Sequence, residues 1–131
     1  MVVIAILVTG GQRTEDPDEY ERKTEVLFTN GSSICELPPL PQSRHHHTQS
    51  GLTTCGGGPG QGAKKSCIKF ESGSWTTLTD NLVEQRLYHS SWVNPDGDTL
   101  LIGGVNGDTT EIVYQNGTSI SSFDLKYYIY G

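Results

Sequence analysis

The sequence predicts an all-β protein, on the strength of its short apolar runs, its turn dipeptides and its glycine content. Glycine accounts for 16 of the 131 residues. Runs such as AILVTGG and TLLIGG are separated by Asn-Gly and Asp-Gly pairs, which favour β-hairpin turns. These pairs are Asn30-Gly31, Asp96-Gly97, Asn106-Gly107 and Asn116-Gly117. A chain of this length corresponds to a single domain, which we expect to span residues 1–131.

A set of sequence features recurs along the chain in a fixed order. Each repeat has an apolar run that ends in two glycines, then an aromatic residue, a polar turn and a further strand-like run. The aromatic residues are Phe28, Phe70 and Tyr114, and the diglycines are Gly10-Gly11, Gly56-Gly57 and Gly103-Gly104. Arg44 and His47 are matched 42 positions later by Arg86 and His89. Recurrence of this kind indicates a repeat architecture.

The repeat length matches the four-stranded blade of a β-propeller. We expect eleven strands, with three in the first repeat and four in each of the others. Blade 1 covers residues 1–43 and lacks its first strand. Blade 2 covers residues 44–85, blade 3 covers residues 86–125, and residues 126–131 begin the next strand.

The repeat resembles that of the kelch family, in which a diglycine is followed by a spaced aromatic residue and a tryptophan. The second repeat matches best, with Gly56-Gly57, Phe70 and Trp75, whereas Ile34 and Ile120 stand at the tryptophan position of the other repeats. The run HTQSGL…CGGG…SC…F…W is similar to that of secreted animal kelch-like proteins. The resemblance implies a propeller that serves as a binding platform. It also implies that polar groups of the segments containing Arg44 and Arg86 bond to neighbouring blades.

Three blades do not complete a ring, because complete propellers have about 4–8. Either the chain is part of a longer protein that supplies further blades, or two copies assemble into a six-bladed homodimer. In the second case Lys126–Tyr130 of one copy would pair beside Ile4–Val8 of the other.

Two cysteines and two sequons indicate an extracellular origin. Cys55 ends the second strand of its blade and Cys67 opens the third, so a disulfide between them fits an antiparallel hairpin. Cys35 is left over. Asn30 and Asn116 lie in Asn-X-Ser/Thr glycosylation sequons at equivalent turns. The alternative is a cytosolic protein with buried free thiols, in which both Asn-Gly pairs serve only as hairpin turns.

Several functional classes conflict with the composition. A net charge of −6 disfavours nucleic acid as a partner, and no apolar run approaches the ~18 residues of a membrane-spanning helix. If residues 45–47 form a strand, only His45 and His47 share a face, which is too few ligands for zinc. The diglycines precede strands rather than a helix, so they do not form a nucleotide loop. We identify no catalytic residue and no metal or other cofactor.

The expected function is therefore binding of a protein or a glycan through loops on one face of the propeller. The opposite face carries both sequons. A copper-radical oxidase such as galactose oxidase also has a kelch-like propeller, so a fragment of such an enzyme is the alternative, and a segment with no activity of its own is a third. The candidate binding residues are Glu15, Asp16, Asp18, Lys64, Lys65 and Asp108.

Overall fold

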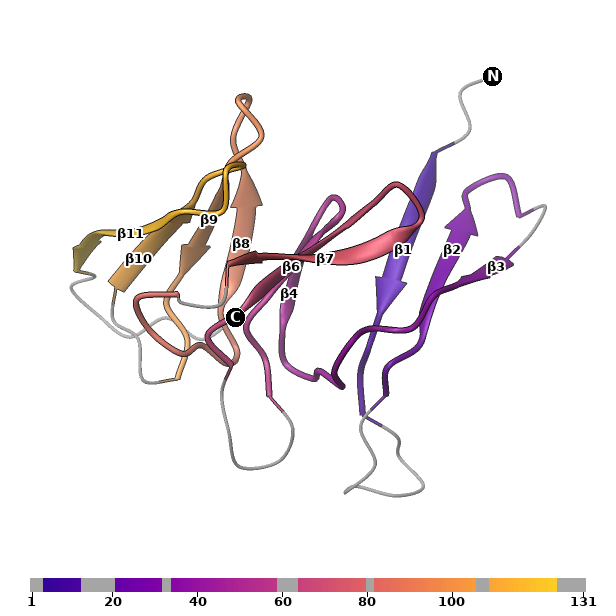
Figure 1. Ribbon diagram of the computed structural model, residues 1–131, viewed down its shortest axis with the longest axis horizontal. Helices are drawn as coiled ribbons and strands as arrows, with labels where there is room; N and C mark the ends of the chain where they lie inside the picture. The colour runs from indigo at the N-terminus through magenta and orange to yellow at the C-terminus, as the bar shows by residue number, and fades with distance from the viewer. Residues whose placement is uncertain are drawn as a thin grey trace.

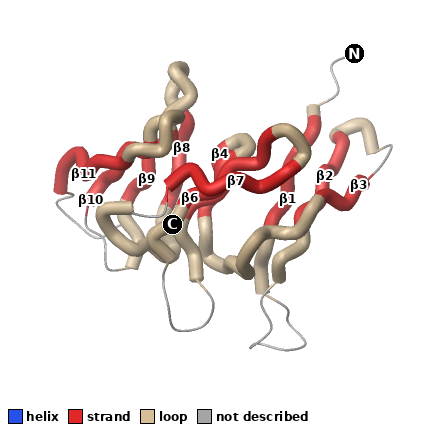
Figure 2. Tube along the Cα trace, in the orientation of Figure 1, coloured by secondary structure: helices blue, strands red, loops and turns tan. Residues whose placement is uncertain are grey.

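The computed structural model describes residues 4–12, 21–31, 34–58, 64–79, 82–105 and 109–124. Its described residues form three antiparallel sheets, which lie side by side in chain order (Figures 1 and 2). The first sheet contains β1 (Ala5–Thr9), β2 (Thr24–Phe28) and β3 (Ile34–Leu37). The all-β prediction is confirmed.

The second and third sheets each have four strands in a simple meander. The second contains β4 (Thr48–Ser50), β5 (Thr53–Cys55), β6 (Cys67–Glu71) and β7 (Ser74–Thr79). The third contains β8 (Ser90–Val93), β9 (Thr99–Ile102), β10 (Thr109–Val113) and β11 (Ser119–Asp124). Within the described residues this gives the expected eleven strands, grouped as three, four and four. Their assignment to propeller blades stays a prediction.

The diglycines end β1, β5 and β9 for a conformational reason. Gly56 and Gly57 have φ angles of 62° and 75°, in the left-handed region that residues with a Cβ rarely adopt. The other two diglycines also have positive φ. The chain therefore leaves each of the three strands at the same point, which is why the repeat is detectable in the sequence.

Each sheet has one cross-strand pair directly before its diglycine. The pairs are Thr9–Thr24 in the first sheet, Cys55–Cys67 in the second and Ile102–Thr110 in the third. The two cysteines are joined by the predicted disulfide. Because the equivalent pairs contain no cysteine, the disulfide belongs to the second sheet alone.

The main apolar cluster lies between the second and third sheets. It contains the disulfide together with Leu82, Leu101 and Val113, all of which are buried. Leu101 lies on β9 and Val113 on β10, so their shared face of the third sheet is the one that packs toward the second. This contact fixes the position of the segment that connects the two sheets.

Two details differ from the sequence-based expectations. His45–His47 do not form a strand, because β4 begins at Thr48 and His46 has a φ of 52°. The argument that strand alternation separates these histidines was therefore wrong. Tyr114, expected within a strand like Phe28 and Phe70, lies just beyond the end of β10. Its backbone N donates to Thr118 O and so belongs to the turn between β10 and β11. Residues 126–131, expected to begin a further strand, and the turn at Asn106-Gly107 lie outside the described residues.

Candidate functional site

The repeated Arg-X-X-His segments lie at the two junctions between sheets. The backbone carbonyl of Arg44 accepts a hydrogen bond from Gly11 N at 2.8 Å. The carbonyl of Arg86 accepts one from Gly57 N at 2.9 Å. The same bond thus joins the first sheet to the second and the second to the third. The diglycines of the first two sheets are attachment points as well as strand ends.

Each of the two histidine rings contacts a threonine hydroxyl of the preceding sheet, at the end of β1 in one case and at the start of β4 in the other. His47 Nε2 lies 3.0 Å from Thr9 Oγ1, and His89 Nε2 lies 2.9 Å from Thr48 Oγ1. A further hydroxyl pair, Ser50 Oγ to Ser91 Oγ at 2.6 Å, links β4 to β8. The first strands of the second and third sheets, β4 and β8, are therefore joined by polar contacts rather than by apolar packing.

The guanidinium groups of the same segments bond within their own sheets. Arg44 Nη1 donates to Gly56 O at 2.7 Å and to Ser66 O at 3.0 Å, and its Nη2 donates to Ser66 Oγ. Arg86 Nη1 donates to Gly103 O at 2.8 Å and to Thr109 O at 2.9 Å. The strand end at each diglycine exposes carbonyls in pairs, and the planar fork of arginine matches this arrangement.

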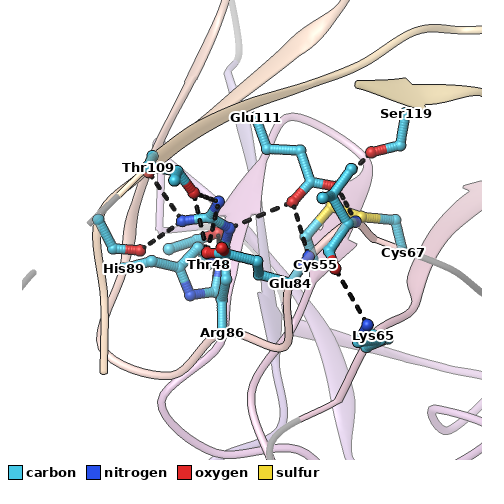
Figure 3. Close-up of polar contacts among 12 residues, drawn as sticks. Thr48, Cys55, Lys65, Cys67, Glu84, Arg86, His89, Thr109, Glu111 and Ser119 are labelled. Atoms are coloured by element: carbon cyan, nitrogen blue, oxygen red, sulfur yellow. Dashed lines mark hydrogen bonds and ion pairs between the residues drawn. A yellow bond between two sulfur atoms is a disulfide. The ribbon is translucent and has the colours of Figure 1, made fainter. Parts of the chain in front are cut away.

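In the described part of the chain, the second junction alone contains a buried ion pair (Figure 3). Arg86 Nε lies 3.3 Å from Glu111 Oε2, and both side chains are fully buried. Glu111 also accepts bonds from Val83 N at 2.6 Å and from the hydroxyl of Ser119. A second carboxylate, that of Glu84, lies 3.6 Å from Arg86 Nη2. Glu111 was not among the predicted residues, although an acidic residue at the centre of the strand TTEIV was the available signal.

Burial controls the charge of the junction residues. It lowers the pKa of His47 to about 4, and the nearby guanidinium of Arg44 acts in the same direction. Burial and the guanidinium of Arg86 likewise lower the pKa of His89 to about 4. Burial lowers the pKa of Arg44 to about 10, so this side chain stays cationic at neutral pH. The rings of His47 and His89 are therefore neutral at pH 7, while Arg44 remains charged.

We expect Gly56→Ala to destabilise the protein by more than the roughly 1–2 kcal/mol cost of a left-handed residue. A Cβ at Gly56 would lie 2.7 Å from Arg86 O and 2.6 Å from a carbon of the His89 ring. Gly51→Ala is the matched control, because Gly51 has a similar φ of 57° and nothing lies within 4 Å of its Cβ position. Urea unfolding of both variants measures the difference. Equal losses would show that the junction has room for a methyl group.

Two of the six predicted binding-loop residues are placed by the structure, and both have intramolecular partners. Lys64 Nζ donates to Gln42 Oε1 at 2.6 Å, and Lys65 Nζ donates to Val83 O at 3.0 Å. These bonds connect the start of the third strand of the second sheet to the two segments that link the sheets. The predicted residues Glu15, Asp16, Asp18 and Asp108 lie outside the described part of the chain.

Three other residues singled out in the sequence are placed by the structure, namely Trp75, Asn30 and Asn116. Trp75, on β7, packs edge-on against Phe70, and its Nε1 donates to Pro38 O at 2.9 Å. Asn30 and Asn116 both lie in turns. The sequon at Asn116 is exposed, and the hydroxyl of Thr118 donates to Asn116 Oδ1 at 2.7 Å.

One repeat-related pair was not predicted. His46 and Tyr88 both have positive φ, at 52° and 53°, and their rings stack with centroids 3.9 Å apart. The 42-residue offset that relates Arg44 to Arg86 also relates these two positions, so the repeat contained the signal. The exposed rings add a third type of contact at the second junction.

Two cavities border β1. A groove of about 500 Å³ lies between β1 and β4 and is lined by Leu7, His47 and Gln49, among others. A more apolar cavity of about 330 Å³ lies between the first two sheets, with Leu7, Val26 and Phe70 in its wall. Gln49 Nε2 donates to Leu7 O at 2.7 Å, so this carbonyl of β1 points away from β2. The groove is therefore on the unpaired edge of the three-stranded sheet.

Within the described ranges, no three His, Cys, Asp or Glu side chains come close enough to hold a metal ion together. The same part of the chain contains no helix that is long and apolar enough to cross a membrane. Comparison of the whole chain with protein families and with curated proteins finds no match. The kelch resemblance therefore rests on the repeat motifs alone.

Proposed function

We propose that this chain is a kelch-like propeller segment that acts as a non-catalytic binding module for a protein or a glycan. The observation that carries the proposal is the structural role of five charged or histidine side chains. Arg44, Arg86, His47, His89 and Glu111 are bonded to backbone and side-chain groups at or beside the sheet junctions. Side chains in such roles hold a scaffold together, which leaves recognition to the loops.

The blade interpretation is supported by the repetition of contacts rather than by the sheets alone. The same glycine-to-arginine backbone bond occurs at both junctions, and at each of them the histidine of the Arg-X-X-His segment contacts a threonine hydroxyl of the preceding sheet. A rigid unit that repeats with constant contacts is the basis of propellers and other repeat folds. Further blades, from a longer chain or from a second copy, would complete the ring.

An extracellular location is part of the proposal. The Cys55–Cys67 disulfide is of the kind that persists in oxidising compartments. The exposed turn at Asn116 presents a sequon that a glycosyltransferase could reach. Glycans at Asn30 and Asn116 would occupy the β2–β3 and β10–β11 turns, away from the loops that carry the candidate binding residues.

The test measures binding to arrayed glycans and to a displayed peptide library. We expect a specific ligand, and we expect its binding to be lost when Glu15, Asp16 and Asp18 are changed together to Gln and Asn while the melting temperature is kept. A parallel titration with Cu²⁺ addresses the oxidase alternative. Stoichiometric, tight copper binding with visible absorbance would overturn the proposal in favour of an enzyme fragment.

A further inference from the structure

The third sheet has an apolar face that no described part of the chain covers. Trp92, Leu100, Ile112 and Ile120 are neighbours in the strand register and form one row across all four strands. Trp92 is 56% exposed and Ile120 is 46% exposed. The opposite face of this sheet carries Leu101 and packs toward the second sheet. Leu100 and Ile112, at the centre of the row, are half-buried. An apolar row with exposed side chains at both ends is typical of an interaction surface.

The first sheet, at the other end of the molecule (Figure 1), has a comparable face. Ile6 and Val8 on β1 are 47% and 49% exposed, and Leu27, which pairs with Ile6, is 41% exposed. Leu7 and Val26 point the other way, because they line the cavity shared with the second sheet. Within the described residues, the first and third sheets therefore each have one uncovered apolar face.

The repeat register shows what the open face of the first sheet corresponds to. Aligning the pairs before the diglycines places Val8 at the position of Leu101, and Leu27 at the positions of Phe70 and Val113. Phe70 faces the first sheet, and Leu101 and Val113 face the second. In the second and third sheets, the face equivalent to this open face packs against the sheet that precedes it in the chain.

The open face of the third sheet has the complementary identity. The same alignment places Leu100 at the position of Leu7 and Ile112 at the position of Val26. Leu7 and Val26 form the side of the first sheet that meets the second. The open face of the third sheet is therefore equivalent to the face of the first sheet that packs against the second sheet. The two open faces thus correspond to the two sides of a contact between neighbouring sheets.

We propose that two copies of this chain associate by packing the open face of each third sheet against the open face of the partner's first sheet. The contact is heterologous, so it must close or it would continue into a filament. Two copies supply six sheets, within the ~4–8 of known propellers, whereas one copy is below that range and three copies exceed it. The inference rests on the blade arrangement proposed above and is independent of the ligand.

Sedimentation and native mass spectrometry test the assembly at micromolar concentration. We expect a species with twice the 14.3 kDa mass of one chain. Trp92→Lys on the third sheet and Val8→Lys on the first should each give monomers, because a lysine on either face would be buried without a partner. Val83→Lys is the matched control, since Val83 is 45% exposed but lies in the segment between β7 and β8, and it should stay dimeric.

A mixture of the two monomeric variants tests the pairing of unlike faces. Such a pair retains one intact contact, formed by the unaltered third sheet of one chain and the unaltered first sheet of the other. We therefore expect the mixture to form dimers more weakly than the unaltered chain. A monomeric wild type, open-ended polymers, or a mixture that stays monomeric would overturn the proposal. None of these results depends on ligand or copper binding, so failure here is distinct from failure of the proposed function.

Discussion

Arg86→Met should lower the free energy of unfolding by about 3–5 kcal/mol, because it removes one member of a buried ion pair. Glu111 would keep its bond from Val83 N but would lose the guanidinium that neutralises it. A carboxylate without a counter-ion in a fully buried position is strongly unfavourable. Urea unfolding at pH 7 gives the change directly. The loss is a substantial fraction of the roughly 5–15 kcal/mol stability of a typical domain.

Arg44→Met is the matched control, because it occupies the same position in the preceding repeat. The contacts of the Arg44 guanidinium in the described structure are Gly56 O, Ser66 O and Ser66 Oγ, none of which is charged. Its removal leaves unpaired polar groups but no buried charge, so we expect a smaller loss. Adding Glu111→Gln to Arg86→Met should then restore part of the lost stability. Equal losses in the two arginine variants, with no restoration by Glu111→Gln, would contradict this account.

The strand ends and the disulfide could be predicted from the repeat in the sequence. Few residues other than glycine fit at Gly56 and Gly57, because both positions combine a positive φ with close contacts to neighbouring atoms. Such positions recur in the sequence and place the strands. The disulfide was predictable for a similar reason, since Cys55 and Cys67 had to face each other across one hairpin.

The polar contacts were less predictable, because equivalent positions contain different residues. Ile68 in the second sheet corresponds to Glu111 in the third, so no comparison between repeats indicates an ion pair. The direction of a long side chain is also not determined by its place in the repeat. Arginine can reach either adjacent sheet, and only the position of the free carbonyls at each diglycine directs it to its own.

The three consecutive histidines illustrate the same limit on a smaller scale. A run of histidines is the sequence pattern of a metal site, but the backbone at His46 is left-handed and the run is not a strand. His47 turns toward Thr9, whereas His46 stacks on Tyr88. The rings of His46 and His47 therefore serve separate contacts, while the ring of His45 packs edge-on against that of His46 with centroids 4.5 Å apart.

Acidification should destabilise the protein between about pH 6.5 and pH 4 because of His47 and His89. In the unfolded chain each ring binds a proton near its ordinary pKa of 6.5, whereas in the folded protein the pKa is about 4. The unfolded state therefore takes up more protons in this window, so the free energy of unfolding falls as the pH falls. The difference corresponds to about 3 kcal/mol for each ring. The stabilising contribution is complete above pH 6.5 and is lost by pH 4.

The geometry of the two rings explains why protonation is unfavourable. Nδ1 of His47 and Nδ1 of His89 are buried with no hydrogen-bond partner in the structure. A protonated ring carries N–H groups on both nitrogens, so one of them would be buried and unsatisfied beside a guanidinium. Urea unfolding from pH 7.5 to pH 4 should show the fall, and His47→Gln and His89→Gln should each reduce its slope. If His47→Gln and His89→Gln leave the slope unchanged, other groups control the acid stability.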